Sequence, residues 1–426
     1  MNKKRIILLF LLFAWVHTTL FAKTFTYAQV HSMPLSIEKD YYIWRFLEQK
    51  NTTKAESKKI IKEASRLNKK LKTAYKKKTG LMASIPKRKP IGGFSSHIDW
   101  KERAKAHKYF KHGLALLQQG KKTQASGYFY LARHAYTKRY DVDKSLFWLY
   151  LISKEKRYIK ALRESREVNI YTLMAADAMN ARYPKTITAQ LWDEKKTNFN
   201  ITNPIDWAKV KYRMNTEDDL EALAQEHKNQ ECIGIYTYIK ARACNYEDSY
   251  FPMPYRKVMK KLPKKRQALI YAIARQESRF VPASVSRSFA LGMMQFMPFL
   301  IKHIAKEKGQ NMDLDMMFNP YKAIEYADYH LNYLNTYLYH PLFVAYAYNG
   351  GIGFTRRHIQ GDKHFRKGAY EPYMSMETMK NVEAREYGKK VLANYVIYLN
   401  KLGVSTRLFP LLKVLATPKK TDKFRE

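Results

Sequence analysis

Apolar residues recur at the spacing of an α-helix along most of the chain, and this periodicity limits the possible folds more than any other feature. The segments between Ile37 and about Tyr246 are typical of amphipathic helices of modest length, one of which we expect from Ala55 to Tyr75. Turn-forming Gly (16) and Pro (15) are scarce beside Tyr (33), and 46% of the residues are hydrophobic, enough for extensive cores. The sequence therefore predicts an all-α protein whose N-terminal helices stack as hairpins in a superhelix or solenoid.

A proline-rich junction divides the chain near residue 250. Residues 250–254 read Tyr-Phe-Pro-Met-Pro, and Pro263 suits the start of a new helix. We therefore expect a leader over residues 1–22, a helical superhelical domain over 23–250 and a second, mainly helical domain over 251–426.

The N-terminus is typical of a secretory signal. Basic residues at positions 3–5 precede an apolar run from Ile6 to Val16, which is shorter than the roughly 20 residues of a membrane span. Export to the periplasm is therefore expected, and the alternative is a retained anchor in the inner membrane that leaves the protein facing the periplasm.

The formal net charge of +41 favours binding to polyanions. Nucleic acid, acidic lipid and the anionic cell wall all fit this charge, and export favours the cell wall over nucleic acid. A peripheral contact with the membrane or with other cell-wall enzymes stays open.

Cys232 and Cys244 are the only cysteines. They are too few to hold a metal, no His/Cys cluster accompanies them, and the sequence predicts neither a metal nor a cofactor. In an oxidising compartment they could form a disulfide, and two free thiols are the alternative.

One carboxyl ends an apolar helical stripe after Pro263. Ile270, Ile273 and Ala274 lie seven, four and three residues before Glu277 and so share its helix face. A carboxyl on the core side tends to keep its proton, and a protonated glutamate near neutral pH can act as a general acid. Glutamates at helix ends are more often solvated or capping residues, so position alone does not assign this role.

An irregular segment with unusual polar residues follows. Serines at positions 284, 286 and 288 precede Gly292, which would allow a turn or a close backbone approach. Gln295 lies among methionines, where its amide needs partners: backbone groups, or the acetamido group of an amino sugar.

Three motifs in this half resemble those of the lytic transglycosylases with a goose-type lysozyme fold. E-S-R-F-x-P-x-x-x-S and A-x-G-M-M-Q-F-M-P, between residues 277 and 298, resemble the catalytic motif. A-Y-A-Y-N-G-G at 345–351 resembles the second signature, and V-E-A-R-E-Y-G-K-K-V-L at 382–392 the third. The resemblance covers about 255–402, and the preceding helices are similar, through weaker motifs, to the superhelical region of soluble murein transglycosylases.

The resemblance implies roles for individual residues. Glu277 matches the sole catalytic acid/base, and Gly292 and Asn349 match structural positions beside the site. The matched substrate-contacting positions are Ser286, Gln295, Met297, Tyr348 and Glu383. Tyr348 is expected to position Glu277 or to donate a hydrogen bond, whereas Tyr326 and Tyr333 are expected in the core.

The chain also departs from the family pattern at three positions. Phe289 stands where a glycine is usual, Gly350 replaces an alanine and Ala384 replaces a threonine. The first departure is expected to reshape the loop around the sugar, and none of the three removes an acid or a base.

The implied activity is non-hydrolytic cleavage of the MurNAc–GlcNAc β-1,4 bond of peptidoglycan, which leaves 1,6-anhydro-MurNAc ends. No acidic residue follows Glu277 before Glu307, whereas an ordinary glycosidase uses two carboxylates. Two alternatives remain: a lysozyme-like muramidase that hydrolyses the bond, with Glu383 as the nearest second carboxylate, and a non-enzymatic basic scaffold that binds the cell wall.

Overall fold

The computed structural model describes residues 23–86, 100–191, 199–361 and 364–426. Regular structure in these residues is helical, and extended segments meet only in isolated β-bridges, so the expected all-α class is confirmed. The leader expected over residues 1–22 lies outside the described residues. None of the described helices is both long and apolar enough to cross a bilayer.

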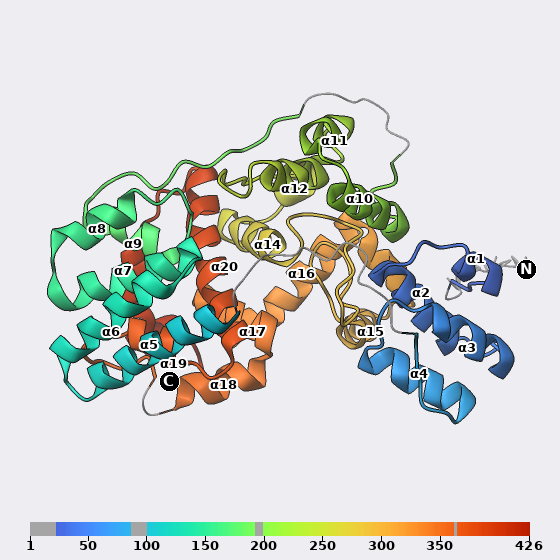
Figure 1. Cartoon of the computed structure of the whole chain (residues 1–426), viewed down its shortest axis with the longest axis horizontal. Coiled ribbons are helices and arrows are strands. Elements are labelled where there is room, and N and C mark those ends of the chain that lie inside the picture. The colour runs from blue at the N-terminus through green and yellow to red at the C-terminus, as the bar shows by residue number, and fades with distance from the viewer. Residues whose placement is uncertain (1–22, 87–99, 192–198, 362–363) are drawn as a thin grey trace, which may run out of the picture.

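The helices of the first half form three groups (Figure 1). The first group contains α1 (Tyr27–His31), α2 (Ile37–Glu48), α3 (Lys54–Ile60), the 3-10 helix η1 (Ile61–Glu63) and α4 (Lys69–Thr79). The second contains α5 (Trp100–Gln118), α6 (Lys122–Ala135), α7 (Arg139–Ser153), α8 (Lys156–Arg163) and α9 (Ile170–Ala178). The third contains α10 (Pro204–Thr216), α11 (Leu220–Glu226) and α12 (Ile233–Ala243).

The second half continues with shorter elements around two long helices. They are α13 (Arg256–Met259), α14 (Lys264–Glu277), α15 (Pro298–Glu307), η2 (Leu314–Phe318), α16 (Pro320–Asn335), α17 (Pro341–Gly350), α18 (Ile352–Gln360), α19 (Tyr373–Thr378), α20 (Val382–Lys401), α21 (Leu408–Lys413), η3 (Val414–Ala416) and α22 (Pro418–Thr421).

The helices α5 to α9 stack in chain order, each packing on the next. Aromatic rings fill the layers between them, as where Phe129 of α6 stacks on Trp148 of α7 with centroids 5.5 Å apart. The expected stacking of helical hairpins is therefore present in this group, which lies at one end of the molecule, opposite α1 to α4 (Figure 1).

The single helix expected from Ala55 to Tyr75 is wrong, because α3 and α4 divide this segment. The Asp40 carboxylate on α2 accepts hydrogen bonds from the backbone N–H and the hydroxyl of Ser65, both at 2.6 Å. Asn68 then caps a new helix by accepting from the backbone N–H of Leu71. Tertiary bonds to α2 thus outweigh the helical periodicity of this stretch.

Cys232 and Cys244 flank α12, and both are free thiols. An eleven-residue helix between them separates their backbones by about 18 Å at 1.5 Å per residue, whereas a disulfide needs Cα atoms about 6 Å apart. The second of the two possibilities, free thiols, is the one present in this structure.

The centre of the molecule is α14, which is buried on every side along residues 268–274 rather than along one stripe. It packs against α20, and α20 packs on α17. A Cβ at Gly388 of α20 would lie 2.1 Å from the Tyr346 ring of α17, so only glycine allows this close helix crossing. The three helices bring residues from around 277, 348 and 387 together.

A buried ion network ties α20 to the stacked helices. The ammonium of Lys389, which has no solvent exposure, lies 3.0 Å from Glu377 and 3.1 Å from Glu386. Tyr171 of α9 donates to Glu377, and Tyr140 of α7 donates to Glu386. Each buried charge is therefore paired and hydrogen-bonded, as a low-dielectric interior requires.

Candidate active site

Glu277 is the last residue of α14, where the chain turns out of the core. Ser278 ends the helix, and its hydroxyl donates to the backbone carbonyl of Met293 at 2.8 Å. Arg279 and Phe280 follow with positive φ angles of 54° and 68°, which turn the chain sharply. The half-buried Glu277 side chain thus lies between a packed helix and an irregular loop.

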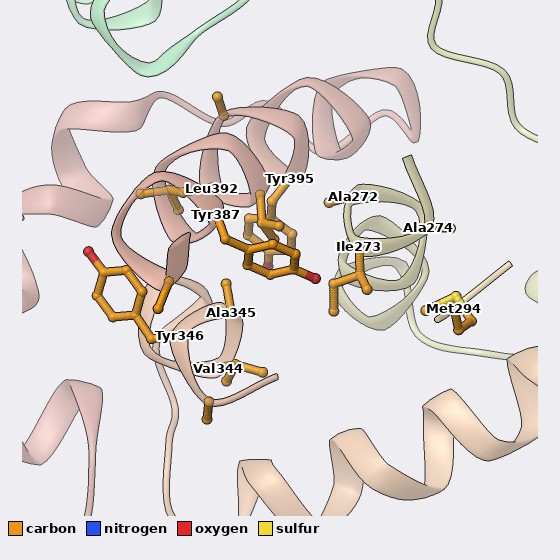
Figure 2. Packing of buried hydrophobic residues seen from close by; sticks show 14 of the residues in the cluster. Ala272, Ile273, Ala274, Met294, Val344, Ala345, Tyr346, Tyr387, Leu392 and Tyr395 are labelled. Carbon is orange, nitrogen blue, oxygen red and sulfur yellow. The ribbon is translucent and has the colours of Figure 1, made fainter. Parts of the chain in front are cut away.

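Within the described part of the chain, one side chain forms a hydrogen bond with the carboxyl of Glu277. Tyr387 of α20 donates its hydroxyl to Oε1 of Glu277 at 2.8 Å. Figure 2 shows the Tyr387 side chain extending from α20 above Val344 and Ala345 of α17, with its hydroxyl directed toward the helix that carries Ile273. The tyrosine is buried, so its hydroxyl is fixed in direction.

Burial raises the pKa of Glu277 to about 8. The hydrogen bond from Tyr387 acts in the opposite direction because it favours the ionised form, and the negative charge of Glu383 adds to the increase. Glu277 is therefore protonated at neutral pH and can lose its proton within reach of that pH, which are the two properties required of a general acid that later acts as a base.

Tyr348 lies beside Glu277 but does not bond it. Its hydroxyl donates instead to the backbone carbonyl of Met294 at 2.9 Å. Burial, followed by the charge of Glu277, raises the pKa of Tyr348, which places the two groups in the same electrostatic environment. The tyrosine that hydrogen-bonds Glu277 is thus Tyr387 rather than the expected Tyr348, and Tyr348 holds the loop that carries Gln295.

Two isolated bridges shape the loop after Glu277. Leu291 pairs with Val285 on one side and with Phe296 on the other. The hydroxyl of Ser286 accepts from the backbone N–H of Ala290 at 2.9 Å, which closes the turn between them. Ser286 therefore stabilises the loop.

The amide nitrogen of Gln295 bonds backbone groups, which is one of the two kinds of partner expected for this side chain. Its Nε2 donates to the carbonyls of Gly292 at 2.8 Å and Ser284 at 3.2 Å, so the nitrogen serves the loop backbone. The residue has a φ of 52° and is half-buried. Among the described residues its amide oxygen accepts no hydrogen bond.

Gly292 allows both a turn and a close approach. Its φ is 77°, and a Cβ there would lie 2.0 Å from the carbonyl oxygen of Met317 in η2. The η2 segment is held in turn by α2, because Arg45 forms ion pairs of 2.7 Å with both Asp313 and Asp315. The N-terminal helices thus support the loop through η2.

Phe289 also joins the loop to α2. It has a φ of 60°, a conformation that glycine adopts more easily, yet its ring is buried. The ring stacks on Trp44 at 5.7 Å and meets the edge of Tyr41 at 5.9 Å. This departure from the family pattern therefore anchors the back of the loop to α2.

The other sequence-predicted residues border the same region. Met297 is the N-cap of α15 and is half-buried, as is Asn349 near the end of α17. Glu383 lies exposed in the first turn of α20, one turn before Tyr387. Tyr326 is buried as expected, but Tyr333 is 48% exposed, so its expected place in the core is wrong.

Replacing Gly292 by alanine is expected to cost more than about 2 kcal/mol of unfolding free energy, since strain at positive φ adds to overlap with a backbone oxygen. Gly309 is a matched control, because its φ is 61° and a Cβ there meets no atom within 4 Å. Gly309→Ala should cost about 1 kcal/mol. Denaturant unfolding of both variants measures the difference, and equal losses would show that the approach to Met317 is unimportant.

Tyr387 is the residue whose role the sequence did not reveal. It stands in the third motif, five residues after Val382, but helical periodicity marks it only as one more core aromatic. Its partner lies 110 positions earlier, so only the packing of α14 on α20 shows the bond.

The fold and the site define a class: an all-helical protein that holds one proton-retaining carboxyl at the end of its central helix. Residues 255–370 match the family model described as Transglycosylase SLT domain. The matched segment contains Glu277, Gln295 and Tyr348.

Two curated relatives are similar to parts of the chain. Membrane-bound lytic murein transglycosylase C of Edwardsiella ictaluri is 37% identical over 108 residues, 23% of this chain and 30% of the relative. Soluble lytic murein transglycosylase of Salmonella typhimurium is 23% identical over 277 residues, 59% of this chain and 42% of the relative. The matches thus span less than half the length of each relative.

Solved structures give a more distant likeness. An inactive mutant of lytic transglycosylase Slt from Pseudomonas aeruginosa has 19% identity and a TM-score of 0.47, over 87% of this chain and 60% of that one. The 70 kDa soluble lytic transglycosylase from Escherichia coli has 17% identity and a TM-score of 0.47, over 93% of this chain and 67% of that one.

Proposed function

We propose that the protein is a peptidoglycan lytic transglycosylase that cleaves the MurNAc–GlcNAc β-1,4 bond and leaves 1,6-anhydro-MurNAc ends. The observation that carries this proposal is Glu277, a carboxyl with a pKa near 8, inside the segment that matches the Transglycosylase SLT domain. The names of the two curated relatives support the same activity.

The reaction needs one group that first gives and then takes a proton. Protonated Glu277 donates to the glycosidic oxygen, and the acetamido group of the muramoyl sugar stabilises the positive charge at its anomeric carbon. The ionised Glu277 then takes the proton from the 6-hydroxyl, whose oxygen attacks that carbon and closes the anhydro ring. The hydrogen bond from Tyr387 stabilises Glu277 during its ionised interval.

Binding would use the groups that the loop leaves available. The amide oxygen of Gln295 and the hydroxyl of Ser286 would contact an amino sugar. The amide nitrogen of Gln295 donates to the loop backbone, and the Ser286 oxygen accepts from it. Met297, Tyr348 and Glu383 complete the proposed contacts, and Asn349 keeps a structural role.

We also propose that the protein works in the periplasm, with residues 1–22 as its leader, 23–250 as the superhelical domain and 251–426 as the transglycosylase domain. The net charge of +41 supports attraction to the anionic cell wall. Neither a metal nor a cofactor enters the proposed reaction.

Digestion of purified sacculi tests the reaction type. A transglycosylase should release muropeptides lighter by one water than those from a hydrolysing muramidase, and mass spectrometry of the soluble products separates the two. Products of the hydrated mass alone would replace this proposal by the muramidase alternative, and an absence of soluble products would favour the non-enzymatic scaffold.

The rate of cleavage is expected to fall as the pH rises above about 8, because the acid form of Glu277 is lost as pH passes its pKa. Tyr387→Phe removes a bond that favours ionisation, so the variant should keep its proton to higher pH and its alkaline limb should move upward. Looser positioning should lower its maximal rate about tenfold to a hundredfold.

The pH dependence of kcat/KM for wild type and Tyr387→Phe checks this prediction. Tyr348→Phe is the matched control, because its hydroxyl bonds Met294 rather than Glu277, and its alkaline limb should stay in place. A Tyr387→Phe profile with an unchanged limb would contradict the assigned hydrogen bond.

A further inference from the structure

The backbone of Lys23 is bonded to the acidic residues that hold η2. Its backbone N–H donates to Oδ2 of Asp313 at 2.8 Å, and the same oxygen accepts from Arg45 of α2 at 2.7 Å. Asp313 is the N-cap of η2, since its Oδ1 accepts from the backbone N–H of Asp315 at 2.8 Å. The segment before α1 therefore meets the carboxylate that connects α2 to η2.

The acidic pair Asp313 and Asp315 carries two negative charges beside one buried positive charge. Both carboxylates and the Arg45 guanidinium are largely buried, and Arg45 bonds both of them. Oδ2 of Asp315 accepts no hydrogen bond from any described residue, and the exposed ammonium of Lys23 lies 3.6 Å from it. Burial raises the pKa of Asp315 against the opposing charge of Arg45, and the charge of Asp313 adds to the increase. A further cation would complete this pair.

The sequence offers two places where a leader could be removed, after Ala22 and after Ala28. Ala28 lies inside α1, whose first turn is fixed by a capping box, so a cut there would divide the helix. It would also release Phe25, whose ring is buried and whose backbone exchanges two hydrogen bonds with the side chain of Gln49. A cut after Ala22 leaves every described contact in place.

Lys23 also borders a pocket of about 770 Å³ between the segment before α1, α1 itself, the N-terminus of α10 and η2. Asp313 and Asp315 line the same pocket, and no step of the proposed reaction uses it. Lys23 and Thr24 are exposed. The pocket therefore leaves room beside the acidic pair for an amine with three donor protons and for the water around it.

We propose that the chain is cut between Ala22 and Lys23 and that the α-ammonium of Lys23 then binds the Asp313 carboxylate as the second cation of the acidic pair. A signal peptidase would add water across the amide bond, so that Ala22 leaves with a carboxylate and the nitrogen of Lys23 becomes an amine. This amine is mostly protonated at neutral pH. The proposal rests on the proposed export to the periplasm and not on the reaction at Glu277.

The amine would strengthen the support of the loop after Glu277. η2 begins directly after Asp313, and the carbonyl oxygen of Met317 in η2 lies so close to Gly292 that a Cβ there would be 2.0 Å away. An ion pair at Asp313 therefore steadies the wall against which the loop packs. The complete support belongs to the processed chain, because before cleavage the nitrogen of Lys23 is an uncharged amide.

The first experiment locates the cut. The full chain, with its own leader, is produced in a Gram-negative host, purified from the periplasm and examined by N-terminal sequencing and intact mass. The mature protein should begin with Lys23. A first residue of Gln29, which would follow a cut after Ala28, or a retained leader would overturn the proposal.

The second experiment moves the amine. Insertion of Gly-Ser between Ala22 and Lys23 displaces the new α-ammonium by about 7 Å and leaves only an amide N–H at Lys23. The Tm of this processed variant should fall at least about 2 °C below that of wild type. Lys23→Ala is the matched control, because it keeps the α-ammonium and removes only the exposed side-chain ammonium, so its Tm should change by less than about 1 °C. An insertion variant with the Tm of wild type would contradict the ion pair.

A double-mutant cycle identifies the partner of the amine. Asparagine at position 313 can still cap η2 through its side-chain oxygen but carries no charge. In Asp313→Asn the Gly-Ser insertion should therefore lower the Tm by less than half as much as in the wild-type background, and an undiminished decrease would overturn the assignment to Asp313. Hydrogen exchange of residues 314–318 tests the same point without this substitution, and it should be faster in the insertion variant than in wild type.

The outcomes are separate from the test of the reaction. Digestion of sacculi reports on Glu277, whereas sequencing and Tm report on the N-terminus. A retained leader would remove both this proposal and the proposed leader but would leave the cleavage activity to be measured. If Lys23 is the first residue and the insertion has no effect, the assignment of the amine alone fails.

Discussion

Glu277→Gln is expected to reduce the cleavage of sacculi at least about a thousandfold. Glutamine keeps the shape of the side chain and can still accept from Tyr387, but it neither donates a proton to a leaving oxygen nor takes one from a hydroxyl. The proposed reaction uses the same carboxyl in both proton transfers, so the substitution impairs both of them. Release of soluble muropeptides over time measures the effect.

Glu383→Gln is the matched control, because Glu383 is an exposed carboxylate close enough to Glu277 to influence its pKa. In the one-carboxyl mechanism Glu383 binds substrate, so Glu383→Gln should lower the rate of cleavage about tenfold or less. A loss as large as that of Glu277→Gln would indicate two essential carboxylates and hence a hydrolysing enzyme.

The thermal stability of Glu277→Gln shows whether its lost activity comes from the missing carboxyl or from misfolding. Its pKa is raised in the folded state, so the carboxyl contributes its full stability below its unfolded pKa and loses it as the pH rises through about 8. Glutamine does not ionise. The melting temperature of Glu277→Gln should therefore equal or exceed that of wild type, most clearly above pH 8, and a marked decrease would mean that lost activity reflects misfolding.

Features set by neighbouring residues could be predicted from the sequence. Asn319 caps α16 through the N–H groups of Tyr321 and Lys322 directly before Pro320, a start signal contained in two residues. The positive φ of Gly292, which marks a turn in the loop, is likewise a property of that residue and its chain neighbours.

Features that depend on distant partners could not be predicted. The break before α4 depends on Asp40, 25 residues before Ser65, and the ring of Phe289 is buried against α2. The hydrogen bond between Tyr387 and Glu277 forms only because α20 packs against α14 in the register that brings these two side chains together. Periodicity identifies the buried face of a helix but not the partner that covers it.

The candidate site therefore combines a local loop with distant supports. The family motifs contain most of its residues, and their order in the chain suggested one site. The geometry adds that Tyr387, not Tyr348, bonds the carboxyl, and that η2 and α2 support the loop from behind. Such supports fix the direction of the reactive groups, on which the efficiency of proton transfer depends.

The largest expected loss of stability comes from Lys389→Met. Methionine fills most of the volume of lysine but removes the ammonium between Glu377 and Glu386, leaving two buried carboxylates without their main partner. Breaking a buried pair on one side typically costs about 3–5 kcal/mol, because the remaining charge is uncompensated. The adjacent Lys390 is exposed and forms no ion pair with any described residue, so Lys390→Met should change the unfolding free energy by no more than about 0.5 kcal/mol.

The pH dependence of this loss shows whether charge is its cause. Burial alone would raise the pKa of Glu386, but Lys389, Lys144 and Arg385 hold it below its usual range, so its stabilising contribution is present above the unfolded pKa and disappears as the pH falls. In Lys389→Met the pKa of Glu386 is no longer held down by the neighbouring ammonium, so this carboxylate takes up a proton more readily. The deficit relative to wild type, measured by denaturant unfolding, should therefore narrow from pH 7 toward pH 4, whereas a deficit that is constant with pH would indicate lost packing instead.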